Sequence, residues 1–144
     1  MKRQLVFVLT VVIALGMLSG CGVKSDKTRV LDRINVFFDA YKENDTYNTI
    51  RCFAGGEQYA DEAYEDVTDL MKQIGCDLYV YGEIERAEVK SVGFPNIKEA
   101  FVALDLYFEG MGEAVQWYME MKKEGANWYI YTIYDHETYF ERKH

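Results

Sequence analysis

The spacing of the apolar residues changes near Cys76, and this change constrains the fold more than any other feature of the sequence. Before it, apolar side chains recur at steps of three and four, which is the period of an amphipathic helix. The pattern predicts a helix from Thr28 to about Asn44, a short second helix from Thr46, and a third helix over 58–74. The first helix has these residues on one face: Val30, Ile34, Phe37, Phe38 and Tyr41.

After Cys76 the apolar residues alternate with polar ones, which is the period of a β-strand. The alternation predicts strands at 78–81, 84–92, 101–108, 114–122 and 128–134. A loop is expected at 93–96, because Pro95 removes a backbone donor there. Helices followed by an antiparallel meander indicate an α+β domain with its helices on one face of the sheet.

In the last predicted strand, alternation assigns neighbouring residues to opposite faces. One face is expected to carry Trp128, Ile130, Thr132 and Tyr134, and the other Tyr129, Tyr131 and Ile133.

Two stretches carry a resemblance to a known superfamily. They read AYKENDTYNTIRCF at 40–53 and KKEGANWYIYTIYD at 122–135. With this order of elements, residues 28–135 resemble the NTF2-like (cystatin-like) superfamily, in particular small bacterial lipoproteins of uncharacterised families. The resemblance implies a cone in which N-terminal helices pack on a curved antiparallel sheet, with Trp128 closing the mouth or floor of the core.

The start of the chain has the features of a secretory signal. Lys2 and Arg3 precede an apolar run over 5–15, which is shorter than the roughly 20 residues of a membrane span. The run leads to LSGC at 18–21, which resembles the bacterial lipobox. That resemblance implies cleavage before Cys21 and a diacylglycerol thioether on its sulfur.

Two lipid chains give stable anchoring where one is marginal, so the mature protein is expected at the cell membrane, on its extracytoplasmic face. The predicted organisation is a signal peptide at 1–20, a tether at 21–27, the α+β domain at 28–136 and a tail at 137–144. Two alternatives remain open: an uncleaved transmembrane anchor, and an ordinary signal peptide with a chance cysteine.

The chain is acidic, with a formal net charge of −8. Removal of residues 1–20 takes away Lys2 and Arg3 and no acidic residue, so the net charge of the mature chain becomes −10. Nucleic acids and anionic headgroup surfaces both favour a basic partner. The composition therefore argues against both as partners.

Two cysteines remain beside Cys21. Cys52 and Cys76 can form a disulfide in an oxidising compartment, where a closed loop of about 25 residues gives a chain-entropy stabilisation of about 3.5 kcal/mol. The alternative is a pair of buried free thiols, since unpaired cysteine packs like a small hydrophobic residue. The spacing of cysteine and histidine fits no zinc site, and neither a metal nor a cofactor is predicted.

An enzymatic role needs a carboxylate inside the cone, as in an isomerase or hydrolase of this superfamily. Asp105 is the acidic residue in the most apolar strand, and burial would raise its pKa and make it a usable base. Alternation places Leu104 and Leu106 inward, however, so Asp105 is expected to point outward. The enzyme hypothesis is therefore the alternative rather than the leading one.

Aromatic residues make up 15% of the chain, and both faces of the last strands carry rings. Tyr118, Tyr129 and Tyr131 are candidates for a binding face for a protein partner, a second copy, a glycan or a peptide, because tyrosine offers large contact area and a polar tip. The alternative is that these rings only suit a half-buried strand face.

A third hypothesis is a small-ligand cup inside the cone, the alternative being a filled core. The candidate lining residues are Phe101, Trp117, Met119, Met121 and Trp128. Together these observations favour a membrane-anchored lipoprotein with a non-catalytic binding or scaffolding role.

Overall fold

The computed structural model describes residues 23–60 and 62–137. The signal segment, Cys21 and the tail from 138 lie outside the described residues, and the predictions made for them stay predictions. Within the described part of the chain, no helix is long and apolar enough to cross a membrane.

The long helix α2, Asp26–Lys42, forms where the spacing of apolar residues predicts a helix. It begins two residues earlier than predicted, because the side chain of Ser25 accepts a hydrogen bond from the backbone N–H of Thr28 and caps the first turn. The buried face of α2 consists of Val30, Ile34, Phe37, Phe38, Ala40 and Tyr41.

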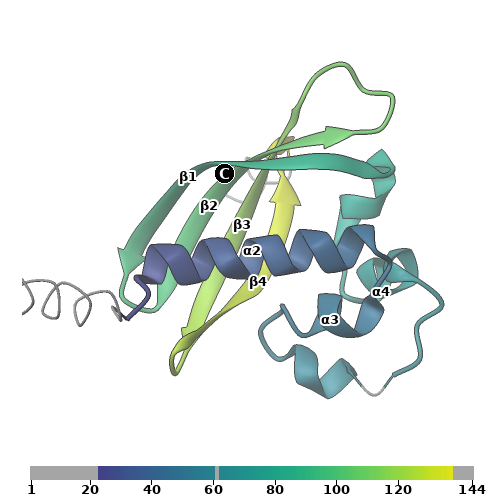
Figure 1. The fold of residues 1–144 in the computed structure, drawn as a ribbon. Coiled ribbons are helices and arrows are strands. Elements are labelled where there is room, and N and C mark those ends of the chain that lie inside the picture. Colours follow the sequence, from purple (N-terminus) through teal and green to yellow (C-terminus); the bar gives the residue numbers. More distant parts are fainter. Residues whose placement is uncertain (1–22, 61, 138–144) are drawn as a thin grey trace, which may run out of the picture.

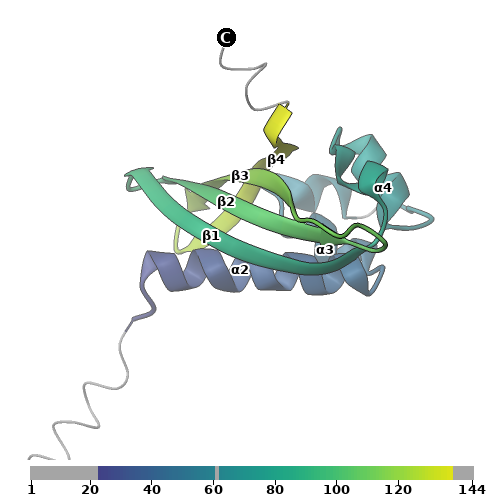
Figure 2. The same cartoon turned by 90° about the horizontal axis from the view of Figure 1, so that it is seen from above.

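Four strands form one antiparallel meander in the order β1-β2-β3-β4, and α2 lies along one face of this curved sheet (Figures 1 and 2). Their bounds are β1 Ile84–Asn96, β2 Glu99–Phe108, β3 Val115–Glu124 and β4 Asn127–Asp135. The predicted fold class, α+β with helices packed on an antiparallel sheet, is confirmed.

The core lies between α2 and the inner face of the sheet. Strand β2 shows the expected alternation most clearly, because every second residue from Ala100 to Phe108 is buried. Burial of one large apolar side chain stabilises a fold by about 1.5–3 kcal/mol. The largest fully buried side chains come from α2, the short helical segments and the sheet, so the core joins all parts of the described chain.

Short helical segments cluster beyond the C-terminal end of α2 (Figure 1). They are α3 Thr46–Ile50, the 3₁₀ helix η1 Gly56–Tyr59, and α4 Val67–Gln73. The single helix predicted over 58–74 is therefore wrong. The carboxylate of Asp66 accepts a hydrogen bond from the N–H of Asp69 and starts a new helix there.

The strand predicted over 78–81 is also wrong, because these residues lie in the 3₁₀ helix η2, Asp77–Tyr81. In a 3₁₀ helix, side chains three residues apart lie on the same side. Leu78 is fully buried and Tyr81 partly buried, whereas Val80 is exposed. An alternating pattern of four residues is compatible with either structure, so the sequence did not decide between them.

Strand β1 continues through residues 93–96, where a loop was predicted. Pro95 is tolerated because β1 is the edge strand of the sheet. The pairing of β1 with β2 shifts register three times, between Ile84 and Arg86, between Val89 and Ser91, and between Gly93 and Asn96. The edge strand is thus long but irregular.

The pairing of β3 with β4 skips one residue between Ile130 and Thr132, so Tyr131 is an extra residue in the ladder. Such a β-bulge reverses which residues beyond it face the core. Ile133 is buried in the core and Tyr131 is exposed, although strict alternation assigned them to the same face. The facing predicted for this half of β4 is therefore wrong.

Gly56 is the glycine with the tightest surroundings. A Cβ at this position would collide with the backbone carbonyl of Ile50, whereas a Cβ at Gly112 would meet no atom within 4 Å. We expect Gly56→Ala to lower the free energy of unfolding by about 1–3 kcal/mol, because the backbone must move to accept the methyl group. Gly112→Ala, measured by the same denaturant titration, should leave stability unchanged or slightly raised. Equal stabilities for the two variants would contradict the close approach at Gly56.

Candidate binding surface

The interior of the cone is filled by side chains. Trp117, Met119, Met121 and Trp128 are at most 1% exposed and belong to the hydrophobic core. Phe101 does not join them, because its neighbours in β2, Ala100 and Val102, face the core. The expectation that Phe101 lines the cone is corrected accordingly.

The polar content of this interior is low. Among the described residues, Thr49 alone is both polar and buried. Its hydroxyl donates a hydrogen bond of 2.6 Å to the backbone oxygen of Asp45. The indole N–H of Trp117 is the buried side-chain donor that has no partner in the described part of the chain. No described carboxylate is buried, so the inside of the cone offers no acid or base.

The outer face of the sheet carries a cluster of rings around Tyr118. Phe101 stacks on Tyr118, with ring centroids 5.4 Å apart. His136 stacks on the same ring at 5.9 Å, and its Nδ1 lies 3.1 Å from the tyrosine hydroxyl. Tyr134, at 6.2 Å, completes the cluster. Tyr118 is therefore held by its neighbours on three sides.

Tyr131 is presented differently, because the bulge in β4 turns it outward. Its side chain is 55% exposed, and the Nζ of Lys122 lies 3.4 Å from its ring centroid. A cation over an aromatic face is an attractive arrangement that leaves the other face of the ring free for contact. Tyr131 and Lys122 together form an exposed aromatic and cationic pair.

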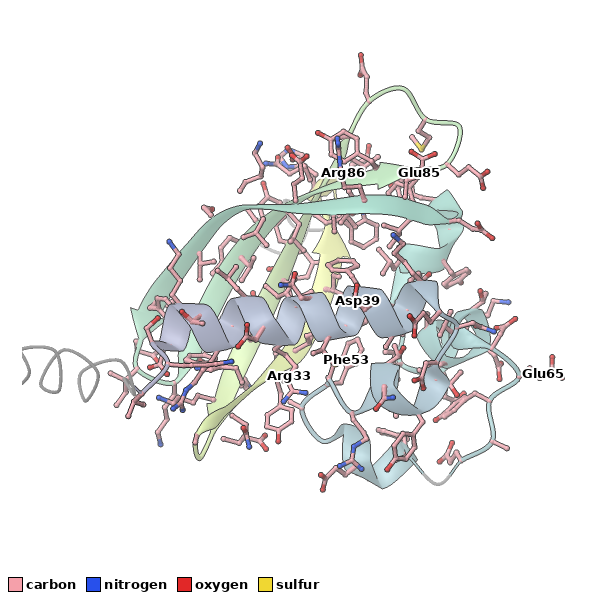
Figure 3. The ribbon with its side chains drawn as sticks, viewed as in Figure 1. Arg33, Asp39, Phe53, Glu65, Glu85 and Arg86 are labelled. Carbon is pink, nitrogen blue, oxygen red and sulfur yellow. The ribbon has the colours of Figure 1, made fainter. Side chains whose placement is uncertain are left out.

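Tyr129 lies apart from these rings, at the edge strand β4. The guanidinium of Arg33, which reaches from α2 toward β4, lies 5.0 Å from the centroid of its ring (Figure 3). The Nε of Arg33 also donates a hydrogen bond of 2.9 Å to the backbone oxygen of Trp128. Of the three tyrosines predicted to form one face, Tyr118 belongs to the ring cluster on β3, Tyr131 lines the outer side of β4, and Tyr129 of the same strand faces Arg33 of α2.

A hollow of about 540 Å³ opens on the outer face, between the end of β1 and strands β2 to β4. We call it the outer groove. The side chains that form its walls come from Pro95, Phe101, Glu120, Lys122 and Tyr131. The outer groove combines two aromatic rings with charges of both signs.

Gly93 keeps the outer groove open. It pairs with Phe101 across the ladder, and a Cβ at this position would meet only the Phe101 carbonyl, at 3.9 Å. A glycine in a strand often marks a place where another group approaches the backbone. The hollow therefore exists because the residue opposite Phe101 has no side chain.

Glu120 supplies the negative charge of the outer groove. One of its carboxylate oxygens accepts a hydrogen bond of 2.8 Å from the hydroxyl of Tyr134, which fixes its position. The groove thus has a held carboxylate beside the cation of Lys122, at the bulge that exposes Tyr131.

Asp105 faces outward, as alternation predicts, because Leu104 and Leu106 are both fully buried. Its carboxylate forms an ion pair of 3.4 Å with Lys90 of the neighbouring strand. A solvent-accessible cross-strand ion pair of this kind contributes about 0–1 kcal/mol to stability.

Cys52 and Cys76 are two separate buried thiols, which is the second of the two alternatives left open by the sequence. Burial raises the pKa of the Cys76 thiol to about 12, and burial also raises the pKa of Cys52, against the opposing effect of Arg33. The Sγ of Cys52 donates to the backbone oxygen of Asn48 at 3.4 Å. Across residues 23–60 and 62–137, no group of three or more His, Cys, Asp or Glu side chains is arranged to hold a metal ion.

Solved structures share this architecture. An NTF-2 like protein of unknown function from Shewanella oneidensis MR-1 superposes with a TM-score of 0.51 at 13% identity, over 76% of this chain and 97% of that chain. The fold is NTF2-like. A domain of unknown function with a cystatin-like fold, from Nostoc punctiforme PCC 73102, also gives a TM-score of 0.51 at 13% identity, over 85% of this chain and 86% of that domain. No protein-family model and no curated protein matches the chain.

Three residues of the outer groove in this NTF2-like domain were not identified from the sequence. Alternation with Tyr118 does place Glu120 and Lys122 on the outer face, but nothing in the spacing marked them as a site. Gly93 was assigned to a loop because of the nearby Pro95, and its position opposite Phe101 became visible only in the strand pairing.

The thiols of the NTF2-like domain offer a direct test of its core. We expect a chain starting at Gly22 to show negligible reaction of Cys52 and Cys76 with a thiol reagent at pH 8, because the raised pKa values leave little thiolate and the sulfur atoms are buried. After unfolding in guanidinium, two thiols per chain should react, and Cys52→Ser should leave one. A chain with no reactive thiol after unfolding, and a mass lower by two hydrogens, would contradict the separate thiols.

Proposed function

We propose that this protein is a lipid-anchored extracytoplasmic binding module that takes a protein partner on the outer face of its NTF2-like sheet. The observation that carries the proposal is the contrast between the two faces. The inner face is filled by Trp117 and its neighbours, whereas the outer face presents an open groove beside Tyr131.

The composition of the outer groove favours a protein surface over an enclosed small ligand. Tyrosine is enriched at protein interfaces, where it fills hollows of the partner and keeps a polar tip. The groove is open along one side, and Lys122 and Glu120 add charges of opposite sign that can pair with a polar rim. Except for Phe101, the side chains proposed to line a small-ligand cup are packed in the core. A second hollow of about 540 Å³ lies at the margin of the domain, between the end of α2, α4 and the start of β1, and none of the proposed cup residues lines it.

The carboxylate-dependent enzyme is the weaker alternative. It requires a buried acid or base, and the described residues contain no buried carboxylate. Asp105, the residue considered for this role, pairs with Lys90 on the outer face.

The anchoring part of the proposal rests on the sequence around Cys21. We expect the wild-type protein to enter the detergent phase after Triton X-114 partition and to carry a diacylglycerol mass on its first residue, Cys21. Cys21→Ser should abolish the lipid mass and leave the signal segment uncleaved by the lipoprotein peptidase. An unchanged mass and unchanged partition of Cys21→Ser would contradict lipidation and favour an ordinary signal peptide or a membrane anchor.

The binding part is tested by photo-crosslinking in cells that make the protein. Tyr131 and Tyr47 are matched positions, because their side chains are 55% and 54% exposed. We expect benzoylphenylalanine at position 131 to give a discrete higher-mass adduct on illumination, and the same label at position 47, on α3, to give none. An adduct of twice the chain mass would identify the partner as a second copy.

The variant Gly93→Leu tests whether the crosslink at position 131 depends on the outer groove. Because Gly93 has open space around its Cβ position, a leucine there should fill the outer groove without lowering the melting temperature, and should remove the adduct from position 131. Identical adducts from positions 131 and 47, or an adduct unaffected by Gly93→Leu, would contradict binding at the outer groove.

A further inference from the structure

The charges of the domain are separated between its two ends. Residues 42–60 and 62–86, which include the short helical segments, contain ten acidic and four basic residues. We call this part the acidic end. Glu65 and Glu85 are labelled on this side, away from the start of α2 (Figure 3). The net charge of −10 expected for the mature chain is therefore unevenly distributed.

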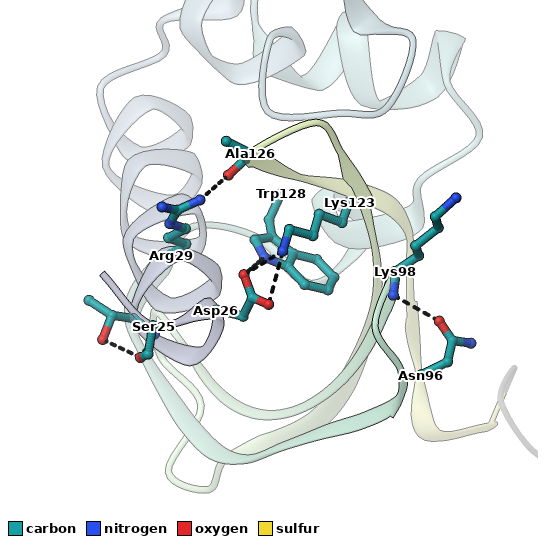
Figure 4. A network of polar contacts seen from close by, with 9 residues as sticks. Ser25, Asp26, Arg29, Asn96, Lys98, Lys123, Ala126 and Trp128 are labelled. Atoms are coloured by element: carbon teal, nitrogen blue, oxygen red, sulfur yellow. Dashed lines mark hydrogen bonds and ion pairs between the residues drawn. The ribbon is translucent and has the colours of Figure 1, made fainter. Parts of the chain in front are cut away.

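The opposite end has the reverse sign. We call residues 24–33, 96–99 and 122–127 the basic end, because they contain seven basic and four acidic residues. The three segments meet in space. The backbone N–H of Lys123 donates a hydrogen bond to the backbone oxygen of Lys98. Arg29 of α2 donates to the backbone oxygen of Ala126 (Figure 4).

Two of the acidic residues at the basic end are already neutralised inside it. Asp26 accepts hydrogen bonds from Lys123 and from the indole of Trp128, and these contacts hold the pKa of its carboxyl below the usual value. Asp32 pairs with Lys24 at 2.7 Å. Within the described residues, the exposed side chains of Lys27 and Lys98 make no ion pair, so their charges face solvent.

Exposed apolar side chains accompany these lysines. Ile97, at the tip of the β1–β2 hairpin, is 81% exposed, and it directly precedes Lys98. Phe94 of the same hairpin is also exposed on one side, while its ring meets Trp128 at 5.7 Å. Apolar residues next to basic ones are typical of surfaces that lie at the boundary between lipid headgroups and water.

The basic end is also the end nearest to Cys21. α2 begins at Asp26, and each residue of extended chain spans at most about 3.6 Å. The few residues between Cys21 and α2 therefore keep the basic end within about 20 Å of the lipid anchor. Electrostatic attraction decays over about 8 Å at physiological salt. A tether this short holds the basic end near enough to the bilayer for it to approach within that range.

We propose that the basic end of the domain docks on an anionic lipid surface, with Ile97 at the headgroup boundary and the acidic end turned away from the membrane. This orientation rests on the proposed anchor at Cys21 for its proximity to the bilayer, whereas the lipid-binding surface itself consists of described residues. The overall acidity, which argues against an anionic partner, then contributes to orientation because the acidic end is repelled.

A vesicle-partition experiment tests the surface without the anchor. Among residues 23–60 and 62–137, the buried ones lie between Val30 and Tyr134, so a chain starting at Gly22 keeps the described core. Vesicles of phosphatidylcholine alone and vesicles with one third phosphatidylglycerol are compared by flotation at low salt. We expect at least about 25-fold stronger partition to the anionic vesicles, lost at high salt, because Lys27 and Lys98 contribute about fivefold each near an anionic bilayer.

Two double variants with the same change of charge decide where the lipid binds. Lys27→Gln with Lys98→Gln should lower partition to the anionic vesicles by about 25-fold, or fivefold per lysine. Lys42→Gln with Lys72→Gln, at the acidic end, should leave partition unchanged or lower it only slightly, because these two lysines are held away from the bilayer. Circular dichroism confirms that each variant is folded.

Each result of the vesicle experiment either supports or overturns the docking of the basic end. Equal partition to both kinds of vesicle, or an equal loss in both double variants, would overturn the docking of the basic end. Because the tested chain carries no lipid, neither result depends on acylation at Cys21, which is decided by the Cys21→Ser measurement. A preference for anionic vesicles that only the variant of Lys27 and Lys98 loses would support the proposal.

Discussion

The packing of α2 on the inner face of the sheet is the contact on which the rest of the structure depends. A single helix cannot bury its apolar stripe alone, and a four-stranded sheet of this length needs a cover on one face. Once Phe37 and Ile34 occupy the inner face, the alternation of each strand divides its residues between core and surface. The filled cone and the ring-bearing outer face are two results of the same packing.

The outer groove arises from departures from regular strand geometry. A bulge exposes Tyr131, and Gly93 leaves the space opposite Phe101 empty. Regular strands with a side chain at every position would give a flat surface. The proposed binding surface therefore lies where the ladder is irregular, supported by a regular core.

The sequence predicted the long, strongly periodic elements because many residues contribute to each pattern. α2 and strands β2, β3 and β4 were found within a few residues of their bounds. The five residues of η2 were too few to distinguish a strand from a 3₁₀ helix. Pro95 led to a loop being predicted at the end of β1, because the sequence does not show that β1 lies at the edge of the sheet, where proline is tolerated. The bulge at Tyr131 and the separation of charge between the two ends depend on strand pairing, which no local pattern in the sequence reports.

The irregular register of β1 bears on how these molecules behave when they are crowded. The other edge of the sheet is covered, since the backbone of residues 52–54 bonds to Ile130 of β4, and β1 is the edge that remains. A long, flat edge strand is a template for growth of an intermolecular sheet. Three register shifts and a proline break that template into short pieces. We therefore expect neighbouring copies at high local density to touch along this edge without adding strand to strand.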